Sequence, residues 1–115
     1  MSPRSAHDHL PLTPLTLAVL VALADEPLHG YAVLKALEAR PGPRLVGGAG
    51  SLYAALQRMV DEGLLGETEG PGDDVRRRRA FALTRLGREV ARAEMGRLQE
   101  EVRAGRERDL LPEGT

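Results

Sequence analysis

The sequence contains no cysteine and no tryptophan, and its 115 residues include only one phenylalanine and two tyrosines. Without cysteine the chain cannot be cross-linked by disulfides, which fits a reducing, intracellular setting. With so few aromatics, leucine, valine, alanine and methionine must fill the core. The longest apolar run, residues 15–24, is about half as long as a membrane span and lacks the flanks of a secretory signal. We therefore expect a cytoplasmic chain of single-domain size with no membrane segment.

Lysine is scarce as well, since Lys35 is the only lysine among 16 basic residues. These residues are nearly balanced by 17 acids, but the two signs are separated along the chain. Residues 76–92 hold seven arginines and one acid, whereas residues 61–74 hold six acids and no base. A nucleic acid responds to such a local cluster rather than to the net charge.

The first half of the chain predicts three helices. Residues 1–11 are polar with prolines near both ends, and we expect them to form a flexible arm. Thr13 followed by Pro14 is a helix start, and the apolar run after it predicts a helix that is buried on more than one side. Residues 31–40 carry a second apolar stripe. A flexible connection rich in glycine and proline follows. A third helix is predicted over about 50–62, with Gly63 positioned to end it.

In the second half of the chain, the period of the hydrophobic pattern changes. Short extended segments at 64–70 and 78–83 are separated by turn-forming residues, which predicts a hairpin. Thr84 is then expected to cap a last helix from Arg85 to about Gly105. This helix has two apolar sectors, and the second is spaced by four, three and four residues like a coiled-coil seam. The seam consists of Ala91, Met95, Leu98 and Val102.

This order of elements predicts a mainly α protein with a small β-hairpin. We interpret residues 12–84 as a winged helix-turn-helix and residues 85–111 as a C-terminal dimerisation helix. The helix after the glycine-rich connection is then the recognition helix, and the hairpin is the wing.

Three stretches resemble the PadR family of bacterial transcriptional regulators. They are His29-Gly30-Tyr31, "GSLYAALQRMVDEGLL" over residues 50–65, and the arginine-rich wing ending in "FALTRLGRE" over residues 81–89. The resemblance implies a homodimeric, repressor-like regulator with one recognition helix per subunit in the major groove of double-stranded DNA. It also implies a pseudo-palindromic operator and wings that contact the flanking DNA backbone. Some short members bind flat aromatic drugs between tryptophans, and this chain has none, so a drug-sensing role is not implied.

The helix over residues 50–62 supplies the first candidates for DNA contact. At about 100° per residue, Ala54, Gln57 and Arg58 point away from the apolar stripe, and Tyr53 lies at its border. Gln57 can pair with adenine, and Arg58 can reach guanine or phosphate. Tyr53 and Ser51 can bind phosphate. The alternative is that Ser51 only caps the helix and Tyr53 is partly buried against a neighbouring loop.

Further candidates come from the hairpin and the second helix. Arg76, Arg77, Arg78 and Arg79 offer planar donors for phosphate in the wing. The alternative is a solvated charge run neutralised by the aspartates of the turn. Lys35 can contact the DNA backbone or simply be exposed to solvent.

The dimer surface is predicted to combine the seam with Leu15 or Val19 of the first helix. A groove between these residues could admit an apolar effector molecule, although plain dimer packing explains the same residues. We expect Tyr31 to be a core anchor, with Gly30 allowing helices to approach closely.

No catalytic site, cofactor or metal is expected. His7, Asp8 and His9 supply too few placed ligands for a structural metal site. No acid–base pair for catalysis is visible, and the chain is not expected to be an enzyme. The alternative to a DNA-binding regulator is a winged helix that binds another protein and never contacts DNA.

Overall fold

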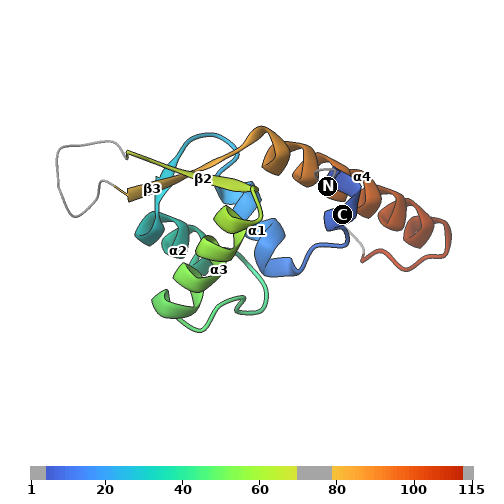
Figure 1. Cartoon of the computed structure of the whole chain (residues 1–115). Coiled ribbons are helices and arrows are strands. Elements are labelled where there is room, and N and C mark those ends of the chain that lie inside the picture. The colour runs from blue at the N-terminus through green and yellow to red at the C-terminus, as the bar shows by residue number, and fades with distance from the viewer. Residues whose placement is uncertain (1–4, 70–78, 113–115) are drawn as a thin grey trace.

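The computed structural model describes residues 5–69 and 79–112, which form four α-helices and a small sheet (Figure 1). The helices are α1 (Pro14–Ala22), α2 (Gly30–Glu38), α3 (Ala49–Asp61) and α4 (Arg85–Glu107), and a short 3-10 helix, η1 (Ala6–His9), precedes them. The strands are β1 (Leu28–His29), β2 (Leu65–Glu69) and β3 (Arg79–Leu83). The order of helices and hairpin strands agrees with the sequence prediction.

The predicted helix boundaries are confirmed at three places. The Thr13 side chain accepts a hydrogen bond of 3.2 Å from the Thr16 amide, and Pro14 occupies the first position of α1. The Thr84 hydroxyl caps α4 by accepting from the Gly87 amide at 2.9 Å. Gly63 follows α3 with a φ of +81°, a left-handed conformation that favours glycine.

The sheet has one strand more than the sequence predicted. Its antiparallel order is β1-β3-β2, so the strand that contains Phe81 lies in the centre. Leu28 pairs with Phe81 on one side, and Glu67 pairs with Phe81 on the other. Because β1 is only two residues long and lies between a helix end and a helix start, no alternating pattern in the sequence identifies it.

The core is aliphatic around a single aromatic side chain, as the composition requires. Every α-helix and the two hairpin strands contribute to it, and Phe81 is its only fully buried aromatic residue among those described. The other fully buried side chains include Leu20, Leu23, Val33, Leu52, Leu56, Met59, Leu64, Leu65 and Val90.

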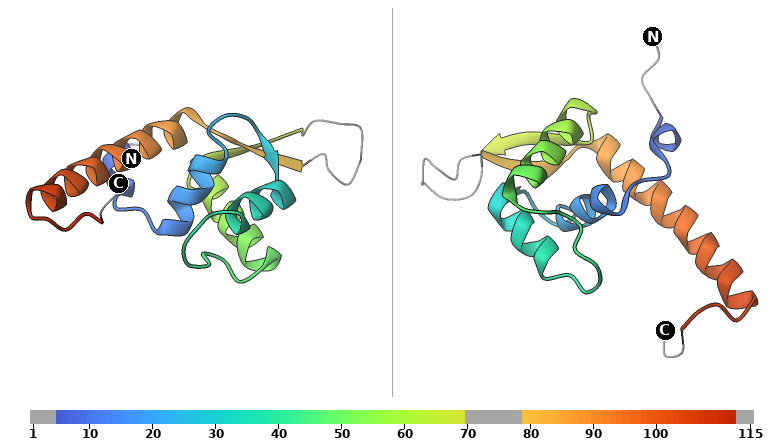
Figure 2. Two further views of the ribbon diagram at one scale, coloured as in Figure 1. Left: turned by 180° about the vertical axis from the view of Figure 1, so that it is seen from behind. Right: turned by 90° about the horizontal axis from the view of Figure 1, so that it is seen from below.

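The arm predicted to be flexible is in part folded. Residues 6–9 form η1, which the Asp8 carboxylate caps by accepting a 2.9 Å hydrogen bond from the Ser5 amide. η1 lies beside α4 (Figure 2), where Ala6 and Leu10 pack against the core. The prediction of a loose arm is therefore wrong for the residues described.

The connection before α3 also differs from the prediction. Val46 is buried and Leu45 packs against the core, so this glycine- and proline-rich segment is anchored rather than free along its length. Its last residues already belong to α3, which begins at Ala49 after an N-cap at Gly48.

Candidate nucleic-acid interface

Helix α3 has the two faces that its sequence predicts. Leu52, Ala55, Leu56 and Met59 are buried, whereas Ser51, Tyr53, Ala54, Gln57 and Arg58 are exposed. Ser51 lies in the first turn, and α3 has no side-chain cap. The interpretation of Ser51 as the helix cap is therefore wrong, and its hydroxyl lies on the surface at the start of α3.

Tyr53 rests on the start of α2. A Cβ atom added to Gly30 would come within 2.5 to 2.6 Å of three atoms of the Tyr53 side chain, including its hydroxyl. Gly30 therefore allows α2 and α3 to approach closely, as the sequence predicted. The side chain that occupies the space beside it is that of Tyr53. Tyr53 remains 44% exposed in this position.

Tyr31 does not lie in the core, and its prediction as a core anchor is wrong. The side chain is 60% exposed, because the buried side of α2 is formed by Gly30, Val33 and Leu37. Its ring lies 5.2 Å from the Lys35 ammonium. The Tyr31 side chain, together with Glu38, raises the pKa of Lys35 above its ordinary value. Lys35 is exposed on α2, as predicted, and forms a 3.7 Å ion pair with Glu38.

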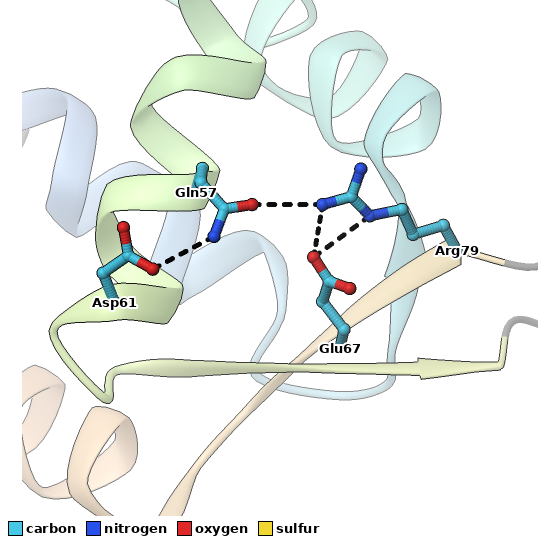
Figure 3. A network of polar contacts seen from close by, with 4 residues as sticks. All are labelled: Gln57, Asp61, Glu67 and Arg79. Carbon is cyan, nitrogen blue, oxygen red and sulfur yellow. Dashed lines mark hydrogen bonds and ion pairs between the residues drawn. The ribbon is translucent and has the colours of Figure 1, made fainter.

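Arg79, the first residue of β3, joins the hairpin to α3 (Figure 3). Its Nε donates to Glu67 Oε1 at 3.0 Å, and its Nη2 donates to Gln57 Oε1 at 3.1 Å. Nη2 also contacts the same Glu67 oxygen. The hydrogen bond to Glu67 raises the pKa of the Arg79 guanidinium, which is therefore charged at any ordinary pH.

Gln57 extends this network along α3. Its Nε2 donates to Asp61 Oδ1 at 3.1 Å, one helical turn further on. The predicted base reader thus already binds Arg79 with its oxygen and Asp61 with its nitrogen. Neither Glu67 nor Asp61 was a predicted site residue, although the four-residue spacing of Gln57 and Asp61 was a visible signal.

Arg58 is directed to the side of α3 that faces α1. Its Nη2 donates to the Thr16 hydroxyl at 3.3 Å, and its Nε lies 3.9 Å from Glu62. Arg58 is therefore exposed but lies at the border of the predicted reading face. Arg76, Arg77 and Arg78 lie outside the described residues.

An apolar groove of about 730 Å³ lies between α1 and α4. Val21 and Met95 line it and are 40% and 46% exposed, and Ala91 lines it while also contacting the core. Val21 was not predicted, because the run that contains it is apolar on nearly every face. Val19, which was predicted at this surface, is completely buried beside Leu20 inside the subunit, so that prediction is corrected.

The remaining seam residues have intermediate or larger exposure. Leu98 is partly exposed, and Val102, in the C-terminal half of α4, is 43% exposed. The C-terminal half of α4 extends away from α1, α2 and α3 (Figure 2). Leu15 packs against the core with part of its surface exposed.

Helices α1, α2 and α3, the hairpin after α3 and the short strand β1 before α2 define a winged helix. Helix α3 has the position of a recognition helix. No helix among the residues described is long and apolar enough to cross a membrane. The PadR-like family of transcriptional regulators matches residues 19–93, and the chain belongs to this family.

Two solved structures illustrate the likeness of fold. A PadR family transcription regulator from Clostridium difficile R20291 has a TM-score of 0.69 at 18% identity, covering 83% of this chain and 97% of its own. Bacillus subtilis PadR in complex with operator DNA has a TM-score of 0.63 at 20% identity, covering 74% of this chain and 48% of its own. Likeness at this level of identity establishes the winged-helix fold.

A sequence relative is more similar over a shorter stretch. A 37.1 kDa protein in transposon TN4556 of Streptomyces fradiae is 49% identical over 76 residues, which cover 66% of this chain. The match covers 20% of that relative's length, so the chain corresponds to about a fifth of it.

Proposed function

We propose that this chain is a cytoplasmic, dimeric repressor that binds a pseudo-palindromic operator in double-stranded DNA. The observation that carries the proposal is the exposed face of α3 beside Arg79 of the wing strand β3, in a member of a regulator family. In the proposed complex, α3 enters the major groove and the wing arginines lie on the flanking backbone.

The exposed side chains divide into two kinds of contact. Tyr53, Ser51 and Lys35 bind phosphates and fix the register of the protein on DNA, whereas Gln57 faces the bases and Arg58 reaches guanine or phosphate from the border of the same face. Arg79 links the base contacts to the phosphate contacts, because it donates a hydrogen bond to Gln57 at 3.1 Å and is the first residue of the wing strand β3.

The operator can be found by selecting bound duplexes from a genomic or random pool. We expect half-sites about one helical turn apart, and a binding constant that falls steeply with salt. Replacing Arg76, Arg77 and Arg78 by alanine should lower the slope of log K against log salt by about 0.9 for each phosphate that is no longer neutralised. A winged helix that binds only another protein would select no duplex and show no such slope.

The dimer is proposed to form through the groove between α1 and α4. Val21 and Met95 there, together with Val102 beyond the groove, are apolar and more than one third exposed, which favours a second copy as the partner. Leu98→Glu should give monomers in sedimentation. Arg85→Glu on the same helix, where the side chain is 94% exposed, should leave the dimer intact.

A small-molecule effector is the remaining part of the proposal. The same groove would take an apolar ligand if the dimer does not fill it. A screen for compounds that release the selected operator tests this. A compound whose effect is lost in Met95→Ala, while that variant still dimerises and binds the operator, would identify the groove as its site.

A further inference from the structure

The network of Asp61, Gln57, Arg79 and Glu67 fixes the orientation of one amide group. Arg79 can only donate hydrogen bonds, and the Asp61 carboxylate can only accept them. The Gln57 oxygen must therefore face Arg79, and its nitrogen must face Asp61, as observed at 3.1 Å each. Rotating the amide by 180° would oppose two donors at one end and two acceptors at the other.

The network leaves the Gln57 amide able to bind a base. An amide has two N–H donors and two acceptor sites, and Arg79 and Asp61 use one of each. One donor and one acceptor remain, which is the number that pairing with the edge of adenine requires. Gln57 can thus be held in place and still pair with a base.

Glu67 holds the Arg79 side chain in place, as Asp61 holds Gln57. An arginine side chain has many rotamers, and fixing it costs conformational entropy at the moment of binding. The Glu67 carboxylate accepts from Arg79 at 3.0 Å and holds the guanidinium beside Gln57 before DNA arrives. Both carboxylates also repel phosphates, which weakens binding to DNA that offers no matching base.

We propose that Asp61 and Glu67 are positioning residues that set sequence discrimination by acting through Gln57 and Arg79. This inference rests on the proposed DNA-binding function. The two acids make binding to arbitrary DNA weaker, and they keep the base-facing groups in one arrangement for the operator. Removing their charge should therefore favour non-operator DNA.

The test compares affinities for the selected operator and for a scrambled duplex by fluorescence anisotropy at several salt concentrations. Glu67→Gln and Asp61→Asn keep the size of each side chain but remove its charge and its acceptor-only character. Each should tighten binding to scrambled DNA and reduce the operator preference at least about fivefold, the low end of one base contact.

The matched control is Glu100→Gln on α4. Glu100 pairs with Arg103 at 2.7 Å, and both side chains are exposed, so the control removes the same charge from a similar ion pair. It should leave the operator preference unchanged. If Glu67→Gln and Asp61→Asn change both affinities by a common factor, only general electrostatics is at work and the inference is refuted.

A second readout separates positioning from a merely structural role. Gln57→Ala should remove the preference at one base pair of each half-site. In that background Asp61→Asn should no longer change the preference there, because Gln57, the group through which Asp61 acts, is gone. An unchanged effect of Asp61→Asn in the Gln57→Ala protein would overturn the inference. If the wild-type protein shows no salt-dependent DNA binding, the proposed function fails first and the inference fails with it.

Discussion

Among the glycines that the structure describes, Gly87 is the one where adding a methyl group should cost the most stability. A Cβ atom there would lie 2.1 Å from the carbonyl oxygen of Leu64 and 3.1 Å from its carbonyl carbon. Carbon and oxygen atoms ordinarily stay about 3.3 Å or more apart, so the backbone would have to move by more than about 1 Å. The Leu64 oxygen is not free to move, because it accepts hydrogen bonds from the Thr84 amide at 3.2 Å and the Thr84 hydroxyl at 3.0 Å.

The expected loss for Gly87→Ala follows from these contacts. Overpacking of this kind costs about 1–3 kcal/mol, and weakening the hydrogen bonds of Thr84 adds about 1 kcal/mol. Alanine recovers up to about 1 kcal/mol through its helix propensity. We expect a net loss of about 1–3 kcal/mol in the free energy of unfolding, measured by urea denaturation, and a fall in Tm of about 4 °C or more.

Gly105→Ala is the matched control in the same helix. A Cβ there would meet its nearest neighbour, the Leu110 Cβ, at 3.8 Å, an ordinary contact distance. The control should be as stable as the wild type or gain up to about 1 kcal/mol. If Gly87→Ala is as stable as Gly105→Ala, then the start of α4 does not lie against Leu64 as described.

Two further predictions concern stability in acid and the position of Tyr53. The Glu94 carboxylate is 1% exposed and accepts hydrogen bonds from Arg97 at 2.5 Å and from the Leu12 amide at 2.8 Å. Arg97 first, and Leu12 after it, hold the pKa of Glu94 below its ordinary value in spite of its burial. Its stabilising effect is therefore present above the ordinary glutamate pKa and is lost as the pH falls through the folded value. Urea denaturation should show that Glu94→Gln is about 1–3 kcal/mol less stable than the wild type at pH 7. The difference should shrink at pH 3, and a constant difference would contradict this cause. Gly30→Ala should displace the partly exposed Tyr53 ring at a cost below about 1 kcal/mol, because the far end of a side chain can move. It should weaken binding to all duplexes about 3- to 10-fold by anisotropy, as expected when one hydrogen bond is removed. Unchanged DNA affinity would show that Tyr53 makes no contact.

The local features of the fold could be predicted because they depend on neighbours in the sequence. Thr13 and Thr84 cap their helices by accepting a hydrogen bond from the amide three residues further on. Gly63 ends α3 through its own backbone conformation. The two faces of α3 follow in the same way from the helical period. Each of these predictions needed only a few consecutive residues.

The features that could not be predicted depend on partners far along the chain. Gly30 was correctly linked to a close helix approach, but the side chain that covers it is Tyr53 rather than the adjacent Tyr31. The contact of Arg79 with Glu67 requires the register of the hairpin, in which Glu67 lies opposite Phe81 and diagonally across from Arg79. The strand β1 likewise exists only because β3 pairs with it.

These distant contacts tie the proposed DNA face together before any DNA is bound. β3, which begins with Arg79, pairs with β1 on one side and β2 on the other. β1 leads directly into α2 at Gly30, whose surface carries Tyr53 of α3, and Gly63 lies in the short turn from α3 to β2. Strand β3 therefore cannot shift relative to α3 without breaking strand pairing or helix packing. Because little ordering remains to be done on binding, α3 and Arg79 should engage DNA as one unit.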